Sequence, residues 1–216
     1  GIELNRPLTA PLVLSNFTFW FGLEQPSNSL LVGGWSIGVE MAFYLLFPIL
    51  VICIRSTRAG IVAFALSCGL LFLYSSKAIN TSVSVSEQWE SYTYALTHLP
   101  FFIGGILLLF VYKKLITANH IRKTGVLLAV IAVVAGAALL AGVDSYADPL
   151  IGTIRYVWLL ICLAFVLAFA LWGIHTHFLL WLGDLSYSIY LGHFFVYLLV
   201  DSLFSSPWII IAFSVL

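Results

Sequence analysis

Three ionisable residues, Glu40, Arg155 and His193, lie in apolar stretches of the sequence. A charged side chain inside a membrane span costs at least about 2.5 to 3.5 kcal/mol, so an ionisable residue there is a candidate for function. A carboxylate or an imidazole can accept or donate a proton in catalysis. We therefore take Glu40 and His193 as candidate catalytic residues.

Glu40 belongs to a polar column on a predicted helix. Ser36, Glu40 and Tyr44 recur at positions i, i+4 and i+8, which places a hydroxyl, a carboxylate and a phenol on one face. We expect this face to begin near the outer interface and to point into the helix bundle. The alternative is a structural carboxylate that pairs with Arg155, although Arg155 could instead bind an anionic group of a substrate.

A second polar stripe contains His193. Ser186, Tyr190, His193 and Tyr197 fall at positions i, i+4, i+7 and i+11 of another predicted helix. A lone histidine in a helix is more often a packed core residue than a catalyst, but the serine and tyrosines on its face favour a functional site. A hydrogen bond from Tyr190 or Tyr197 would fix the tautomer of the imidazole.

The remaining chemistry-bearing residues indicate no metal site. The sequence has no HExxH or CxxC motif, and its three cysteines lie in apolar runs. His98 precedes Pro100 and the pair Gly104-Gly105, which would let another helix approach closely, so we expect it to make hydrogen bonds at a helix interface.

Composition determines which elements position these residues. Of the 216 residues, 62% are hydrophobic and only 8% are charged, and the mean hydropathy is +1.09. A soluble domain has roughly a quarter charged residues. Lipid must therefore cover most of the surface, and the net charge of zero does not suggest nucleic-acid binding.

A membrane helix needs roughly 20 apolar residues, and this length predicts an all-α, polytopic transmembrane helix bundle with about seven to eight spans. Six stretches fit well: 34–54, 59–75, 95–112, 124–142, 150–173 and 185–203. Residues 8–22 form either a span or a re-entrant segment, and a further span starts at Pro207. Basic loops place the end of the first of the six stretches in the cytoplasm. The loop from Lys77 to Tyr94 is expected to be flexible or to form a short interfacial helix.

Two motifs resemble signatures of the acyltransferase 3 family. The family's tryptophan, serine and glutamate signature is similar to the run Trp35-Ser36-x-x-x-Glu40-x-x-Phe43-Tyr44-Leu45-x-x-Pro48. Its late signature is similar to Ser186-Tyr187-x-x-Tyr190-Leu191-x-His193. Between them, Phe101-Phe102-Ile103-Gly104-Gly105 resembles the family's phenylalanine and glycine span, so the resemblance covers nearly the whole chain.

The resemblance implies an integral membrane enzyme, expected in a bacterial inner membrane. It would move an acyl group, commonly acetyl, from acyl-CoA to a hydroxyl of a cell-surface or exported carbohydrate or glycolipid. Acyl-CoA is then a substrate, and no bound cofactor or metal is expected. The expected substrate-binding residues, besides the catalytic candidates Glu40 and His193, are Trp35, Ser36, Tyr44, Arg155, Ser186, Tyr187 and Tyr190.

The chain departs from the family pattern at its start. Family members carry an upstream span with an arginine and a histidine thought to be the catalytic base, and Asn5-Arg6-Pro7 does not match it. We therefore expect residues 1–216 to be a single domain that is truncated at both ends, with His193, Tyr190 and Ser186 acting as hydrogen-bond donors. Glu40, Trp35 and Ser36 would hold the acceptor or the acyl group.

Two other classes of function remain possible on sequence grounds. A transporter or permease component also needs polar stripes in the membrane, but it predicts an internal repeat, and none is evident. In a non-catalytic membrane scaffold, Glu40, Arg155 and His193 would only hold helices together.

Overall fold

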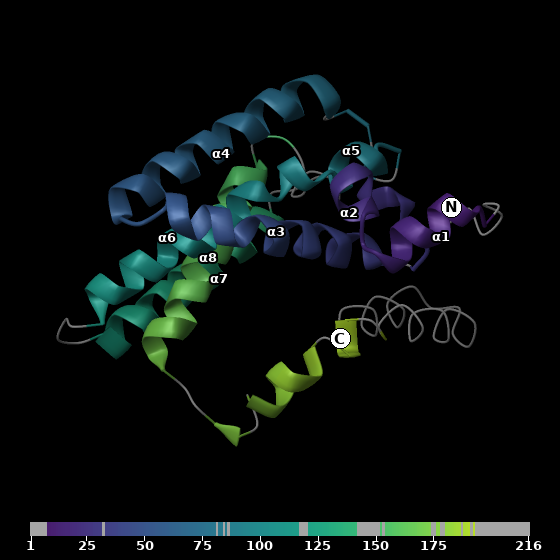
Figure 1. Cartoon of the computed structure of the whole chain (residues 1–216). Helices are drawn as coiled ribbons and strands as arrows, with labels where there is room; N and C mark the ends of the chain where they lie inside the picture. Colours follow the sequence, from purple (N-terminus) through teal and green to yellow (C-terminus); the bar gives the residue numbers. More distant parts are fainter. Residues whose placement is uncertain are drawn as a thin grey trace, which may run out of the picture.

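The computed structural model contains helices and connecting turns, with no strand among the residues it describes (Figure 1). These residues are 8–31, 33–80, 82, 83, 85, 87–116, 121–141, 152, 154–173, 176, 177, 180–186, 188–190 and 192. The elements are α1 (Ala10–Phe17), α2 (Phe21–Glu24), η1 (Pro26–Asn28), α3 (Gly34–Cys53), α4 (Thr57–Ala78), α5 (Trp89–Thr93), η2 (Ala95–Thr97), α6 (Leu99–Leu115), α7 (Ile121–Ala141) and α8 (Ile154–Trp172). Residues 180–186 and 188–190 are also helical.

Three of the described helices, α3, α4 and α8, are long and apolar enough to cross a membrane. Their outer surfaces support a lipid environment: on α4, Leu66 is 65% exposed and Phe72 is 61% exposed. In water, such a continuous apolar surface would drive aggregation. The chain is therefore an all-helical membrane protein.

The predicted number of spans is confirmed only in part. Five of the six predicted stretches are helical close to the predicted bounds, but α6 has only 17 residues and the apolar part of α7, Lys123–Leu139, is shorter than a full span. Much of the stretch 185–203, and everything from Pro207 onward, lies outside the described residues.

Residues 8–22 do not form one continuous span. Helix α1 ends at Phe17 after eight residues, and α2 begins only at Phe21. Asn16 explains the break, because its side chain donates to the carbonyl of Asn28 at 3.0 Å and accepts from the amide of Leu30 at 2.8 Å. These bonds attach α1 to the loop before α3.

The other helices pack through small residues, as is common in membranes. Helix α7 lies against α8, where a Cβ on Gly125 would come within 2.9 Å of the carbonyl oxygen of Ala168. Helix α6 lies between α4 and α8, with Gly60 facing Leu107 and Gly104 facing Leu163. Of the Gly104-Gly105 pair, only Gly104 has a neighbour within 4 Å of its added Cβ.

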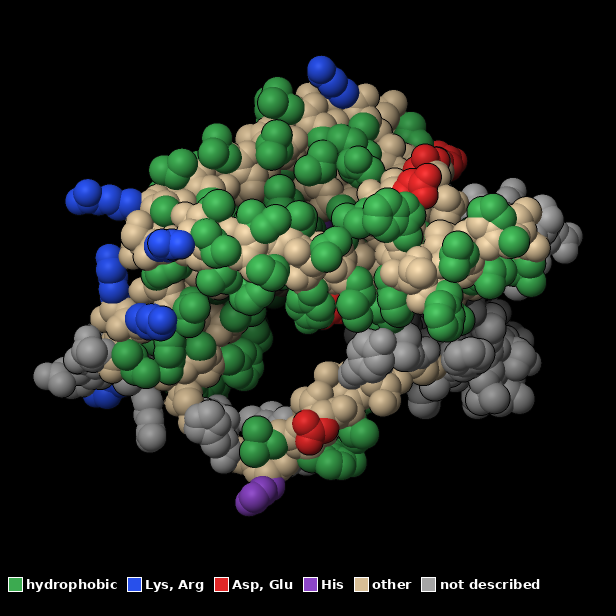
Figure 2. Space-filling view, viewed as in Figure 1, with side chains coloured by type: hydrophobic (Ala, Val, Ile, Leu, Met, Phe, Trp, Pro, Cys, Tyr) green, Lys and Arg blue, Asp and Glu red, His purple; other side chains and the backbone are tan. Residues whose placement is uncertain are grey.

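Charged residues separate along the molecule. Most lysines and arginines gather where α3 and α6 end and α4 and α7 begin (Figure 2). Of the described acidic residues, Glu24, Glu87 and Glu90 lie toward the opposite end, near α2 and α5, as does Lys77. Glu40 lies within α3, and Asp184 lies in the helical stretch 180–186. The loop after α4 contains the short helix α5, which agrees with the second alternative predicted for it.

Candidate functional site

The polar column of α3, defined as Ser36, Glu40 and Tyr44, lies on one face of the helix as predicted. The expectation that this face points into the helix bundle is wrong, because α2 and the aromatic side chains of α6 pack against other sides of α3. The hydroxyl of Tyr44 donates a hydrogen bond to Oε1 of Glu40, one helical turn away. Both side chains are exposed, and Tyr44 has 54% of its surface free. Glu40 lies six residues into α3, about 9 Å from the N-terminal end of the helix at 1.5 Å per residue. The carboxylate is therefore accessible within the N-terminal half of a membrane helix.

Tyr190 connects the late motif to the start of α3. Its hydroxyl lies 2.5 Å from Oγ of Ser36 and donates to the carbonyl oxygen of Gly33 at 2.8 Å. Oγ of Ser36 also lies within hydrogen-bonding distance of this carbonyl, at 3.1 Å. Gly33 precedes α3 with φ of 78°, a left-handed conformation that glycine adopts without steric cost. The two family-like motifs, 154 residues apart, therefore meet at this point.

Figure 2 shows an open space between the main body of helices and the helical residues 180–186 and 188–190. In the same view, α3 borders this space (Figure 1). Ser186 is exposed and donates to the carbonyl of Gly183 at 2.7 Å, within its own segment. Tyr187 and His193 lie outside the described residues, so their predicted roles remain predictions.

Arg155 is the buried member of a cluster, which we call the aromatic cluster: Trp35, Trp89, Tyr92, His98 and Arg155. Arg155 is 5% exposed, and its guanidinium donates to the carbonyl of Thr97 at 3.0 Å. Its Cζ lies 5.1 Å from the centre of the Tyr92 ring, a cation–π distance. Burial raises the pKa of the Tyr92 phenol, which keeps this ring neutral.

The partners of His98 determine its tautomer. Arg155 has only donors, so Nδ1 of His98, at 3.4 Å from the guanidinium, must be the acceptor. Nε2 lies 3.2 Å from the carbonyl oxygen of Tyr92 and must carry the proton. His98 is thus a neutral imidazole between a cation and a carbonyl. This confirms its predicted role as a hydrogen-bonding residue at an interface.

The alternative pairing of Arg155 with Glu40 does not occur among the described contacts. Arg155 contacts Thr97, His98 and Tyr92, whereas Glu40 accepts from Tyr44. The pairing fails because Arg155 is turned into the cluster behind α3, while Glu40 lies on the exposed side of that helix. The burial of Arg155 favours a structural role over its predicted contact with substrate.

Trp35 links this cluster to the polar column. Its ring lies 5.3 Å from His98, 5.5 Å from Trp89 and 5.9 Å from Tyr92, and Ser36 is the next residue of α3. Trp35 was predicted to bind substrate, and its observed contacts are with the protein.

Sequence analysis did not identify Gly33, Tyr92 and Thr97 as parts of this region. Thr97 is fully buried and donates to the carbonyls of Tyr92 and Tyr94. A threonine beside His98 at the start of a span was an available signal. The carbonyl of Gly33 had none, because every residue has one.

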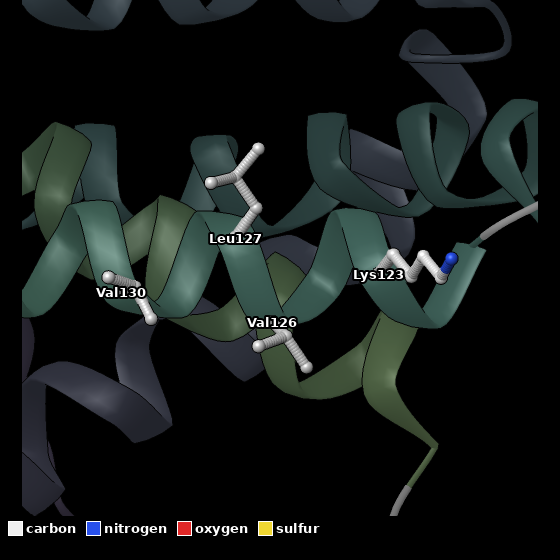
Figure 3. Close-up of a pocket in the computed structure, with 4 residues that line it drawn as sticks. All are labelled: Lys123, Val126, Leu127 and Val130. Atoms are coloured by element: carbon white, nitrogen blue, oxygen red, sulfur yellow. The ribbon is translucent and has the colours of Figure 1, made fainter.

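An open surface depression of about 400 Å³ lies on the exposed side of α7 and does not involve the candidate residues. It is lined by Lys123, Val126, Leu127 and Val130, which extend from one helix (Figure 3). This lining is almost entirely apolar and provides no catalytic group. Within the described part of the chain, no group of three or more His, Cys, Asp or Glu residues could hold a metal ion.

Comparison with known proteins gives one match. A family model described as an acyltransferase domain, that of the acyltransferase 3 family, matches residues 7–216. Neither the curated proteins nor the solved structures contain a match. The family match covers nearly all of the 216 residues, including both motifs that meet at Tyr190. The chain therefore belongs to the acyltransferase 3 family of membrane acyltransferases.

Proposed function

We propose that this protein is a membrane-embedded O-acyltransferase of a bacterial inner membrane. It moves an acyl group, in the first instance acetyl, from acyl-CoA to a hydroxyl of a cell-surface or exported carbohydrate or glycolipid. The coarser statement, a membrane acyltransferase, follows from family membership. The donor and acceptor classes are the proposal.

The observation that carries this proposal is the contact between Tyr190 and the start of α3. It brings a serine hydroxyl, a tyrosine hydroxyl and, one turn further along α3, the Glu40 and Tyr44 pair into one region. A site for acyl transfer to an alcohol needs groups that orient the hydroxyl and donors that stabilise the oxyanion. These side chains supply both kinds of group.

We propose that Glu40 binds the hydroxyl of the acceptor. Its second carboxylate oxygen can accept a hydrogen bond from the sugar hydroxyl while Tyr44 holds the first oxygen. This arrangement raises the electron density on the hydroxyl oxygen and fixes its direction. His193 is proposed to act nearby as a hydrogen-bond donor, together with Tyr190.

In this reaction one carbon–oxygen bond forms and one carbon–sulfur bond breaks. The acceptor oxygen forms a bond to the thioester carbonyl carbon, and the carbonyl electrons move onto its oxygen to give a tetrahedral oxyanion. The carbon–sulfur bond then breaks, CoA leaves as the thiol, and the proton of the acceptor hydroxyl is transferred through a base to the sulfur. Hydrogen-bond donors are most valuable at the oxyanion, where they act in a low-dielectric site.

The test is acetyl transfer by the intact protein in native membranes. Labelled acetyl-CoA is supplied together with surface polysaccharide from the host after mild alkaline removal of its ester groups. We expect Glu40→Gln, which keeps the size and removes the charge, to lower transfer about 100-fold, because an amide accepts a weaker hydrogen bond from the acceptor hydroxyl and cannot take its proton. His193→Ala should also lower it.

Glu90→Gln is the matched control. Glu90 is an exposed glutamate of α5 outside the polar column, so this variant should retain the wild-type rate. Wild-type activity in Glu40→Gln at equal protein level would remove Glu40 from the mechanism. Failure of the wild-type protein to transfer label from acetyl-CoA to any hydroxyl of the polysaccharide would refute the proposed function itself.

A further inference from the structure

Helix α3, which carries the polar column, is held on two sides. On one side it crosses α2, where a Cβ added to Gly22 would lie 1.9 Å from the carbonyl oxygen of Gly38. On the other side it meets α6 through long aromatic side chains. Among the described elements, the close backbone neighbours of α3 are α2 and η1, and α6 is not one of them.

The contact with α6 is an aromatic seam, defined as Trp35, Phe43 and Phe47 of α3 together with His98 and Phe102. The Phe102 ring stacks on Phe43 at 4.9 Å and meets Phe47 edge-on at 6.1 Å. One turn toward the outer end, His98 meets Trp35 at 5.3 Å. Phe102 is therefore the ring that α3 contacts at two successive turns.

The seam and the polar column run in parallel around α3. Trp35, Phe43 and Phe47 repeat at multiples of four residues, as do Ser36, Glu40 and Tyr44. Each residue turns a helix by about 100°, so each member of the column lies about 100° around the helix from the seam. A rotation of α3 that changed the seam would turn Glu40 and Ser36 by the same angle.

We propose that the seam sets the rotation of α3, and that Phe102 is a positioning residue that keeps the polar column turned toward Tyr190. The effect of Phe102 on catalysis rests on the proposed function, whereas its effect on the rotation of α3 does not. It also assigns a role to the phenylalanine and glycine run of α6: Phe102 holds α3, and Gly104 accommodates Leu163 of α8.

Phe102 has this influence because side chains, and not close backbone packing, join the two helices. When the Phe102 ring is removed, Phe43 and Phe47 lose their aromatic partner on α6. The crossing of Gly22 and Gly38 still holds the outer part of α3. The helix can then roll about that crossing. Small angular errors at a catalytic group have large effects on rate.

A photocrosslink tests the geometry without any need for activity. p-Benzoylphenylalanine replaces Tyr190 in the intact protein in membranes, and the yield of crosslinks to peptides containing Gly33 or Ser36 is measured by mass spectrometry. Phe102→Ala is added in one sample and Phe101→Ala in another. Both variants remove the same atoms, because each replaces a phenylalanine by alanine. Phe101 precedes Phe102 on the same helix and makes none of the ring contacts found for the described residues.

We expect Phe102→Ala to lower the crosslink yield several-fold and Phe101→Ala to leave it within twofold. Equal yields in the two variants would overturn the proposal. Phe102→Leu keeps most of the apolar volume without the stacked ring, so it should fold and give an intermediate yield. A wild-type yield from Phe102→Leu would show that bulk alone is needed and would equally overturn an aromatic positioning role.

Kinetics with Tyr190 intact separate positioning from loss of folded protein. Phe102→Ala should raise the KM for the de-esterified polysaccharide and lower kcat/KM for it about tenfold, while the KM for acetyl-CoA stays within about twofold. A simple loss of folded protein lowers kcat and leaves both KM values unchanged, which would overturn the proposal. If the wild-type protein transfers no acetyl group, the proposed function fails, and the crosslink still decides the role of Phe102.

Discussion

The carbonyl oxygen of Gly33 and the hydroxyl oxygens of Ser36 and Tyr190 form a triangle with three short oxygen–oxygen contacts. Only two hydroxyl protons are present, so only two of the three contacts can be hydrogen bonds at one time. One hydroxyl donates to the carbonyl of Gly33 and the other donates to the first hydroxyl. The two arrangements exchange by rotation of the hydroxyl groups. Either side chain can therefore satisfy the carbonyl alone.

This sharing predicts how two substitutions combine. Ser36→Ala and Tyr190→Phe each remove one hydrogen bond, about 0.5 to 1.5 kcal/mol, and the double variant removes both. In a double-mutant cycle measured by thermal unfolding of the intact protein in detergent, the two effects should therefore add. If the hydroxyls bonded only to each other, either single variant would already lose the whole effect. A double variant no less stable than the singles would contradict the triangle.

At this scale, sequence reasoning predicted the side-chain patterns and missed the main-chain contacts. The spacing of Ser36, Glu40 and Tyr44 indicated a shared face, because helical periodicity fixes which side chains can meet. The carbonyl of Gly33 and the partner of Arg155 depend on how helices far apart in the sequence pack. Charge complementarity suggested Glu40 for Arg155, and the cluster around His98 provides a neutral alternative.

At the scale of elements, the crossing of α2 and α3 depends on two glycines. The Cβ of an alanine at position 22 would lie 1.9 Å from the backbone oxygen of Gly38, and backbone cannot rotate away as a side chain can. Gly69 of α4 is the opposite case, with no atom within 4 Å of an added Cβ. The two glycines provide a matched comparison.

Gly22→Ala should destabilise the intact protein by about 1 to 3 kcal/mol, the usual effect of overpacking. Gly69→Ala should be neutral or stabilise by up to about 1 kcal/mol, because alanine is the better helix former. Thermal unfolding in detergent measures both, with the acetyl-transfer rate of Gly22→Ala expected to fall as α3 loses its neighbour. Shifts of the same sign and size would mean that α2 and α3 do not cross closely.

Helix positions were predictable because hydropathy and helix length constrain them together. The stretch 34–54 became α3 (Gly34–Cys53), and the stretch 150–173 contains α8 (Ile154–Trp172). Residues 8–22 could not be resolved in this way. Their break depends on the bonds from Asn16 to the loop at residues 28–30, which are tertiary contacts without a local pattern.

At the scale of the whole molecule, the separation of charge gives the protein a direction in the membrane. Lys113 and Lys114 end α6, and Arg58 lies in the first turn of the neighbouring α4. Glu87 lies before α5, beyond the opposite end of α4. Basic loops remain in the cytoplasm, so the polar column, which begins at the other end of α3, should lie near the outer face.

Cysteine labelling of intact cells tests this orientation. In a variant in which Cys53, Cys68 and Cys162 are replaced by serine, a membrane-impermeant maleimide should label Glu87→Cys from outside. It should label Lys114→Cys only after the cells are made permeable, since the positive loop is cytoplasmic. Leu66→Cys, in the middle of α4 and 65% exposed in the structure, should be labelled in neither case, because lipid excludes the water that thiolate formation needs.

Labelling of Lys114→Cys in sealed cells would invert the orientation and put the acceptor site on the wrong side for an exported carbohydrate. Labelling of Leu66→Cys would show that water, and not lipid, covers α4.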